Sequence, residues 1–413
     1  MGWQNLRVLC AIFAGMAVTG NAAVLQVGPG KTYTAPCAAL AAAHDGDTVQ
    51  IDAATYSGDV CAFSQNNLTL VGVNGRPHID AAGQTAQGKG IWVPYGSNLT
   101  VDNIEFSGAV SADHNGAGIR ASGMNWTVRN CYFHDNQDGI LESNIAGSQV
   151  LIEFSQFSRN GYGDGQSHNL YIGHVAQLTF QYNWSHDSKI GHLLKTRAAM
   201  NYILYNRLTD QSGTGSYEID IPNGGTSYVI GNLIQQGVNS QNSNILAYLE
   251  EGIDPNNPGM DLYVVNNSFV NNKNSGTYID AGSADTVPVT ITNNIFDGPG
   301  SITNQSGAVL TNNFVGDPLF VNAAAYNYRL SAGSPAVDAG TDPGAAHGFS
   351  LKPAYQYVQP TCGQARRQAG TAIDIGGYEY RGGGAPLACD CPTCQSPVRR
   401  TAAIPRSATS VMP

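Results

Sequence analysis

Short segments of alternating apolar and polar residues recur along this chain at a nearly constant spacing. Each segment is rich in β-branched and aromatic residues and is bounded by Asn, Asp, Gly or Ser, a pattern typical of β-strands. The apolar residues that end eight successive copies are Phe106, Phe133, Phe157, Trp184, Leu208, Ile234, Phe269 and Phe296. Successive differences between these positions are 27, 24, 27, 24, 26, 35 and 27, which indicates a stacked structural repeat.

A repeat of this length that contains strands and turns favours a solenoid. Helical repeats of similar length would place apolar residues at i, i+3 and i+4, and these segments do not. We therefore predict an all-β fold, a right-handed parallel β-helix in which each coil buries its inward residues by stacking on its neighbours. The Ala-rich stretch 37–43 predicts a short N-terminal capping helix.

Asparagine precedes the apolar anchor in several copies. Examples are Asn103, Asn130, Asn206 and Asn232. Asn tolerates the left-handed backbone region, so these residues suit a tight turn between strands. Their side-chain amides could also stack from coil to coil. Both interpretations make them structural rather than ligand-binding.

The two ends of the chain differ from the repeats. Residues 1–22 resemble a secretory signal, because Arg7 precedes a short apolar run and a small-residue cleavage site lies at 20–22. The β-helix domain is expected to span 23–380, and the stretch 381–413 to be disordered. Since the apolar run is short for a bilayer, we expect a secreted or periplasmic protein without a membrane anchor.

Cysteines lie near both ends. Cys37 and Cys61 flank the predicted capping helix and the strand after it, so a disulfide between them would tie the cap to the first coil. Cys389, Cys391 and Cys394 lie together in the tail. Three thiols at this spacing lack a fourth ligand for a metal ion, and disorder is the favoured interpretation.

Composition supports the fold and limits the partners. Only 12% of residues are charged and 49 of 413 are Gly, which suits a long, turn-rich β structure. The net charge of −10 argues against nucleic acid as a partner, because phosphate binding needs a basic surface. To bind an acidic polysaccharide, this acidic protein would need a groove that is locally basic. We expect the protein to act as a monomer.

Strand alternation predicts where such a groove lies. In the strand before each anchor, the middle residue is apolar and is expected to face inward. The outward column is then Arg120, Leu141, Tyr171, Lys195 and Asp220. Arg197 lies one alternation beyond Lys195, at about 7 Å along the strand, and Glu218 lies one alternation before Asp220.

Titratable residues concentrate in the stretch 168–220, which holds four of the nine histidines. Two adjacent cations lower the pKa of a lysine by repulsion, so we predict Lys195 as a general base and Arg197 as a clamp for a carboxylate. This pair suits β-elimination, in which the abstracted proton is α to a uronate carboxylate. The other predicted catalytic residues are Tyr171, His168 and His192. The predicted substrate-binding residues are Arg120, His174, Tyr217 and Asn223.

Several stretches resemble the pectate-lyase-like right-handed parallel β-helix superfamily. Its N-terminal cap is similar to residues 46–56, which begin Gly-Asp-Thr-Val-Gln-Ile. The closing coils of secreted β-helix proteins are similar to residues 317–320, 334–340 and 374–379. The resemblance implies the fold over 24–380. It says little about the reaction, since one fold hosts many chemistries.

The stretch from His192 to Arg197, followed by 201–206, is similar to the catalytic coil of chondroitinase-B-type and alginate lyases. In that group a Lys beside a small hydroxyl residue is the base, and Lys195 and Thr196 match. The group also holds calcium with paired glutamates just upstream, and 189–192 lacks them. The resemblance therefore leaves open which group neutralises the uronate carboxylate: Arg197, or calcium bound by Glu218 and Asp220.

Three other functions remain open. A glycoside hydrolase would use two carboxylates about 5–9.5 Å apart, for which Glu218 and Asp220 are the candidates. A uronate C5-epimerase would use the same residues as a lyase. A surface or adhesin β-helix would bind glycans without forming a product. The favoured function is a secreted lyase of an acidic polysaccharide.

Overall fold

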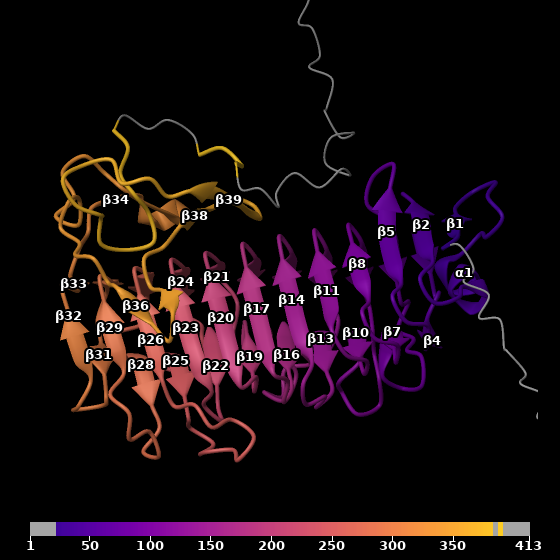
Figure 1. Ribbon diagram of the computed structural model, residues 1–413, viewed down its shortest axis with the longest axis horizontal. Helices are drawn as coiled ribbons and strands as arrows, with labels where there is room; N and C mark the ends of the chain where they lie inside the picture. The colour runs from indigo at the N-terminus through magenta and orange to yellow at the C-terminus, as the bar shows by residue number, and fades with distance from the viewer. Residues whose placement is uncertain (1–21, 383–386, 391–413) are drawn as a thin grey trace, which may run out of the picture.

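The computed structural model describes residues 22–382 and 387–390. Three long parallel sheets, called sheets A, B and C here, run side by side along the molecule and form a parallel β-helix (Figure 1). Each coil contributes one strand to sheet A, then one to sheet B, then one to sheet C. The predicted all-β solenoid is confirmed. The predicted secretory signal lies outside the described residues, apart from position 22.

Sheet A has 12 strands and faces the viewer in Figure 1. Its strands are β1 (Val24–Val27), β2 (Thr48–Asp52), β5 (Thr69–Val73), β8 (Thr100–Asp102), β11 (Trp126–Arg129), β14 (Gln149–Glu153), β17 (Gln177–Gln181), β20 (Met200–Leu204), β23 (Thr226–Ile230), β26 (Leu262–Val265), β29 (Thr290–Thr292) and β32 (Val309–Thr311).

Sheet B has 11 strands and carries the apolar anchors. Its strands are β3 (Thr55–Ser57), β6 (His78–Asp80), β9 (Glu105–Ser107), β12 (Tyr132–His134), β15 (Gln156–Ser158), β18 (Trp184–His186), β21 (Arg207–Thr209), β24 (Leu233–Gln236), β27 (Ser268–Asn271), β30 (Ile295–Asp297) and β33 (Phe314–Val315). Phe106, Phe133 and Phe157 stack in the core with ring centroids 5.0 and 5.1 Å apart. Burying each ring stabilises the fold by about 1.5–3 kcal/mol.

Sheet C has 10 strands and carries the outward column that was predicted to line a groove. Its strands are β4 (Cys61–Phe63), β7 (Gly90–Pro94), β10 (Ala117–Ala121), β13 (Asp138–Glu142), β16 (Leu170–Ile172), β19 (Lys195–Thr196), β22 (Ile219–Ile221), β25 (Asn244–Tyr248), β28 (Thr277–Ala281) and β31 (Ser301–Thr303).

The N-terminal end is capped as predicted. Helix α1 (Pro36–Ala42) begins at a proline, which is well suited to the first helical position, and buries Ala39 and Leu40. A disulfide joins Cys37 of α1 to Cys61 of β4, which confirms the predicted pairing. Within the described part of the chain, α1 and every other helix are too short or too polar to cross a bilayer.

Two columns of residues organise the turn between sheets A and B. Asn103 and Asn130 adopt positive φ of 59° and 54°, so they are the turn residues. The next position forms a buried amide ladder, in which each side chain donates from Nδ2 to Oδ1 of the next at 2.9 to 3.2 Å. The ladder is Asn183, Asn206, Asn232, Asn267, Asn294 and Asn313. The turn role and the stacking role that were predicted for Asn thus belong to two adjacent positions of the coil.

The parallel coils end at β33, earlier than the predicted boundary near 380. The chain then forms three antiparallel pairs: β34 (Phe320–Asn322) with β35 (Asn327–Leu330) around the short 3-10 helix η1 (Ala323–Ala325), β36 (Ala345–Ala346) with β37 (Phe349–Ser350), and β38 (Tyr355–Val358) with β39 (Cys362–Ala365). This C-terminal segment, residues 316–382, folds back over the coils (Figure 1).

The C-terminal segment is held by specific contacts. Leu351 and Val358 pack with Tyr205 and Tyr228 of the coils, and Ala354 donates its N–H to the Tyr205 hydroxyl at 3.0 Å. Within the tail predicted to be disordered, Leu387 packs against the same apolar cluster and Cys389 forms a disulfide with Cys362. Cys391 and Cys394 lie outside the described residues.

Candidate functional site

The predicted outward column of sheet C is present. Strand register aligns Arg120 with Leu141, Leu141 with Tyr171, Tyr171 with Lys195, and Lys195 with Asp220. The residues before them alternate inward and are fully buried in the core: Ile119, Ile140, Leu170, Leu194 and Ile219. Alternation alone therefore brings the aromatic, cationic and acidic side chains onto one face.

Lys195 is surrounded by carboxylates. Its Nζ lies 2.8 Å from Asp220 Oδ2 and 3.1 Å from Glu251 Oε1. Its side chain is only 10% exposed, so both ion pairs are partly shielded from water. Burial alone would lower the pKa of Lys195, but Asp220 and Glu251 outweigh it and the pKa is raised. The prediction that the neighbouring Arg197 lowers this pKa was wrong, because it did not count these two carboxylates.

Arg197 connects the other polar groups of the site. Its Nε donates to the Tyr171 hydroxyl at 2.7 Å, and its second terminal nitrogen lies 2.7 Å from Glu251 Oε2. Its other terminal nitrogen donates to Asn223 Oδ1. Both cations also lie against the Tyr171 ring, with Lys195 Nζ 5.8 Å and the Arg197 guanidinium carbon 5.6 Å from the centroid.

Glu251 is an acidic residue that contacts both cations and that sequence reasoning missed. It lies in the loop after β25, and its two oxygens contact the two cations separately. Its side chain is 48% exposed, and although burial opposes the shift, Arg197 and Lys195 lower its pKa. The sequence signal that could have found it is the Glu250-Glu251 pair. This pair follows β25, the strand that pairs with the strand of Asp220 in the next coil.

His168 and His192 form a buried stack beneath the cations, with ring centroids 4.6 Å apart. The backbone N–H of His192 donates to His168 Nδ1, and the backbone N–H of Tyr217 donates to His192 Nδ1. Burial, followed by the charges of Lys195 and Arg197, lowers the pKa of His168 to about 3. Burial is also the main reason that the pKa of His192 is lowered well below its ordinary value. Both rings are therefore neutral with the proton on Nε2, and His192 Nε2 lies 3.3 Å from Asp220 Oδ2.

The predicted substrate-binding residues lie in different surroundings. Asn223 belongs to the cluster through Arg197, and the Tyr217 ring lies 5.1 Å from the His192 ring. His174 Nε2 lies 3.4 Å from Asp254 and lines a cavity of about 450 Å³. That cavity adjoins Arg197, since Asn257 on its wall donates to the Arg197 carbonyl oxygen at 3.1 Å. Arg120 lies three coils away from Lys195, next to other acids.

Those acids are Asp138 and Glu142 of β13, which sequence reasoning did not single out. Each has one carboxyl oxygen without a hydrogen-bond partner among the described residues. Burial raises the pKa of Glu142 to about 8 and that of Asp138 well above its ordinary value, although the charge of Arg120 opposes both shifts. No sequence pattern distinguishes these acids from exposed ones at a strand end.

Glu218 does not join Asp220. Strand β22 begins at Ile219, so the outward alternation does not extend to Glu218, which is 1% exposed. Burial raises the pKa of Glu218 well above its ordinary value, and its charged neighbours are Asp210 and Lys273. The charged neighbours of Asp220 are Lys195, Glu251 and Arg197. The two carboxyl groups therefore do not share a set of neighbours.

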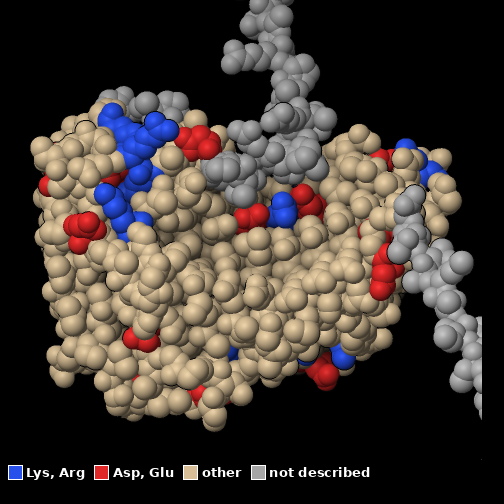
Figure 2. All heavy atoms as spheres, viewed as in Figure 1, with Lys and Arg blue, Asp and Glu red and all other residues tan. Residues whose placement is uncertain are grey.

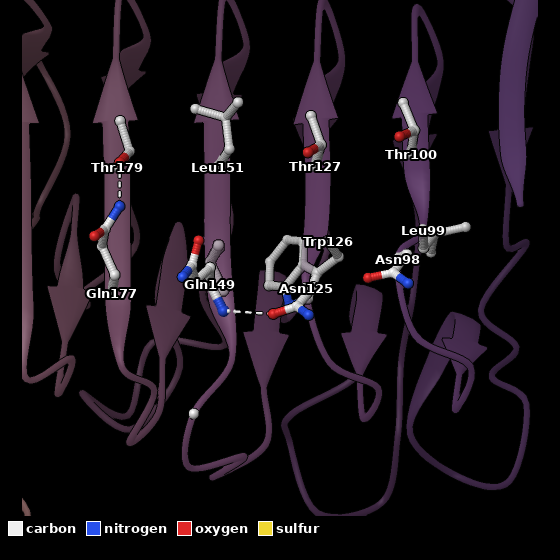
Figure 3. A pocket seen from close by; sticks show the side chains of 12 residues that line it. Asn98, Leu99, Thr100, Asn125, Trp126, Thr127, Gln149, Leu151, Gln177 and Thr179 are labelled. Carbon is white, nitrogen blue, oxygen red and sulfur yellow. Dashed lines mark hydrogen bonds between the residues drawn. The ribbon is translucent and has the colours of Figure 1, made fainter. Parts of the chain in front are cut away.

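A second cavity lies on another face of the molecule. Figure 2 shows that the face over sheet A carries few charged side chains. A cavity of about 650 Å³ opens there, and Figure 3 shows its lining of Asn98, Thr100, Asn125, Thr127, Gln149, Gln177 and Thr179 beside Trp126. Because no charged side chain lines it, this cavity is less suited to an acidic polymer than the cluster on sheet C.

Comparison with known proteins addresses the fold. Residues 64–234 match the family described as "Right handed beta helix region". The crystal structure of pectate lyase Pel9A matches with a TM-score of 0.61 and 16% identity, covering 87% of this chain and 97% of that chain. Comparison with curated protein sequences gives no match.

Pectin methylesterases match less closely. PemA from Erwinia chrysanthemi has a TM-score of 0.38 and 12% identity, covering 76% of this chain and 96% of its own. A pectin methylesterase in complex with a hexasaccharide has a TM-score of 0.34 and 12% identity, covering 70% of this chain and 81% of its own. The family match over residues 64–234 and the three parallel sheets together show that the chain folds as a right-handed parallel β-helix, a fold that it shares with pectate lyase Pel9A.

Proposed function

We propose that this protein is a secreted polysaccharide lyase that cleaves an acidic, uronate-containing polysaccharide by β-elimination. The observation that carries the proposal is the Glu251 carboxylate, which lies 3.1 Å from Lys195 Nζ and 2.7 Å from Arg197. A uronate carries the same chemical group. A sugar carboxylate that displaces the half-exposed Glu251 would therefore meet the same two cations.

Arg197 is the neutralising group in this mechanism. Removal of a proton α to a carboxylate places negative charge on that carboxylate, and a guanidinium that contacts it stabilises the charge as it develops. The hydrogen bonds from Arg197 to Tyr171 and Asn223 hold the guanidinium in place before substrate arrives. Such preorganisation avoids a reorganisation cost during the reaction.

Lys195 is the base. Its neutral Nζ takes the proton from the carbon next to the carboxylate, and the electron pair of that C–H bond forms a carbon–carbon double bond. The glycosidic C–O bond breaks, and the leaving oxygen accepts a proton from the Tyr171 hydroxyl. Because His168 and His192 are neutral and nearly buried, we assign them to positioning Asp220 and the strand rather than to proton transfer.

Calcium does not fit the residues that the sequence suggested for it. A calcium ion takes six to eight oxygen ligands. Asp220 Oδ2 instead contacts Lys195 Nζ and His192 Nε2, and the charged groups that influence Glu218 are Asp210 and Lys273. We therefore propose that Arg197 neutralises the substrate carboxylate, and no step of the mechanism uses calcium. Glu218 and Asp220 also have different charged neighbours, so they give no support to a glycoside hydrolase that would use them as a carboxylate pair.

Two further observations support the class of substrate and the location. Pectate lyase Pel9A, which shares the fold, acts on an acidic polysaccharide according to its name. The disulfides Cys37–Cys61 and Cys362–Cys389 are typical of proteins in oxidising compartments outside the cytosol.

The test is the ultraviolet absorbance of unsaturated uronate after incubation with a panel of polyuronates and glycosaminoglycans. We expect absorbance from wild type with and without chelator, none from Lys195→Ala, and wild-type activity from Lys352→Ala, which removes an exposed lysine of the C-terminal segment. New reducing ends without unsaturation, unaffected by Lys195→Ala, would overturn the lyase in favour of a hydrolase. Inverted uronates without chain cleavage would identify an epimerase.

A further inference from the structure

Two histidines and a glutamate meet on the outer face of sheet B, on a different sheet from Lys195. His78 lies on β6, Glu105 on β9 and His134 on β12, so three successive coils contribute one side chain each. Strand register places His78 directly beside Glu105, and His134 one alternation further along, beside Ser107. One ligand atom from each residue lies within 4.8 Å of the other two.

Both histidine Nε2 atoms lie near one carboxylate oxygen, and His78 Nε2 also contacts Ser107 Oγ at 2.7 Å. Glu105 Oε1 lies 3.0 Å from His134 Nε2 and 4.0 Å from His78 Nε2. Ligands bonded tetrahedrally to zinc at about 2.0–2.1 Å lie a little over 3 Å from one another, so small side-chain rotations would bring all three to one ion. The three side chains are 14% to 28% exposed, which leaves a path from solvent.

Neighbouring groups hold His134 in the orientation that a metal ligand needs. Its Nδ1 lies 2.8 Å from Asp135 Oδ2, and Arg159 donates to both oxygens of Asp135 at 2.7 and 3.1 Å. The Tyr132 ring stacks on the imidazole with centroids 4.3 Å apart. A carboxylate on the far nitrogen fixes the tautomer and directs Nε2 toward the ion, an arrangement common around metal-bound histidines.

We propose that His78, Glu105 and His134 bind a divalent transition-metal ion of the zinc class. Two imidazoles and one carboxylate form a donor set that zinc accepts, with a fourth position left for water. Calcium prefers oxygen ligands alone, so it would bind weakly here. The bound ion would link the coils of β6, β9 and β12, and thereby stabilise the folded state.

His186 provides a matched comparison within the same sheet. It occupies the same column as His134, two coils further on, and its Nδ1 lies 2.6 Å from Asp187 Oδ2. Its Nε2 faces the Gln156 amide rather than a glutamate and a second histidine. The two sites therefore share the His–Asp pair and differ in the other two ligands.

The experiment uses the untagged, full-length protein after treatment with chelator. Isothermal titration with Zn²⁺ should show one tight site per chain, and Co²⁺ should give the visible absorption of a nitrogen- and oxygen-ligated ion. Glu105→Gln and His134→Ala should each weaken Zn²⁺ binding by more than 100-fold, and Asp135→Asn by about 10- to 100-fold. His186→Ala should bind as wild type does, and Ca²⁺ should give no tight site.

Thermal unfolding keeps the result interpretable. Without metal, Glu105→Gln should unfold cooperatively near the wild-type temperature, and added Zn²⁺ should raise the melting temperature of wild type only. The proposal is overturned if wild type shows no tight Zn²⁺ site, or if folded Glu105→Gln and His134→Ala bind Zn²⁺ as tightly as wild type.

Discussion

Lys195 and Asp220 are register partners on adjacent strands of sheet C, and Lys195 Nζ lies 2.8 Å from Asp220 Oδ2. Asp220 is 3% exposed and contacts His192 on the same oxygen. The strand pairing therefore fixes the position of the lysine and also favours its protonated form. A base in this setting gains its reactive form only as the pH rises.

The first prediction concerns the pH dependence of activity. Because the pKa of Lys195 is raised, kcat/KM of wild type should increase about tenfold per pH unit from neutral into alkaline solution. Glu251→Gln removes one of the two carboxylates that raise this pKa, so the pKa should fall and the rise should move to lower pH. The measurement is kcat/KM against pH for both proteins.

Glu250→Gln is the control for this shift. Glu250 is the adjacent residue in the same loop, and its electrostatic neighbours are Asp280 and Asp220 rather than Lys195. Its profile should follow wild type. A Glu251→Gln profile that also coincides with wild type would show that Lys195 is not the group that titrates.

The second prediction concerns Arg197. Arg197→Lys keeps the positive charge but loses the planar set of donors that contacts Tyr171, Asn223 and Glu251. We expect kcat/KM to fall by about 10- to 100-fold, mostly through kcat, because the charge on the substrate carboxylate grows in the transition state. Arg76→Lys, at an exposed position, should leave both constants unchanged. A rise in KM with kcat intact would limit Arg197 to ground-state binding.

The third prediction concerns the buried carboxyl of Glu142. Burial raises its pKa from the ordinary 4.5 to about 8, so the folded state binds this proton more tightly than the unfolded chain does. Its contribution to stability is complete below pH 4.5 and is lost as the pH rises through 8, at no more than about 1.4 kcal/mol per pH unit. Melting temperatures from pH 5 to 9 should therefore decline less steeply in Glu142→Gln. Melting temperatures that decline equally with pH in wild type and Glu142→Gln would contradict this contribution of Glu142.

The fourth prediction concerns the amide ladder. Asn206 donates from Nδ2 to the Phe180 carbonyl at 2.8 Å and to Asn232 Oδ1 at 3.0 Å, and its Oδ1 accepts the Asn183 N–H at 2.9 Å. Asn206→Ala leaves these buried partners unsatisfied, and should lower the free energy of unfolding by about 2–3 kcal/mol. Asn239→Ala, at an exposed turn, should change it by less than about 0.5 kcal/mol. Denaturant titration measures the free energy of unfolding of both variants. Equal values for Asn206→Ala and wild type would contradict a stabilising role for the ladder.

Local rules predicted the coil and the outward column of sheet C because both depend on neighbours in sequence. Period-two alternation placed Tyr171, Lys195 and Asp220 on one face, and the repeat spacing predicted the stacking. Glu251 escaped because a loop side chain is positioned by its partners rather than by periodicity. Glu218 was misplaced because the strand begins one residue later, at Ile219.

The C-terminal segment escaped prediction for a related reason. Its strands pair antiparallel with one another and pack on coils more than a hundred positions earlier, as in the bond from Ala354 to Tyr205. Such pairing leaves no periodic pattern in the chain. Residues 317–320 and 334–340 resemble closing coils in sequence but lie after the last parallel strand, β33.

This return of the C-terminal segment makes the order of synthesis matter for the second half of the solenoid. The early coils, up to β11, can stack as soon as the residues of the following coils have been synthesised. Coils that contain Tyr205, Tyr228 and Asn266 obtain part of their final surroundings from residues 351–378, near the end of the chain. A chain interrupted before that point would present exposed tyrosines along those coils, a surface that chaperones and proteases recognise.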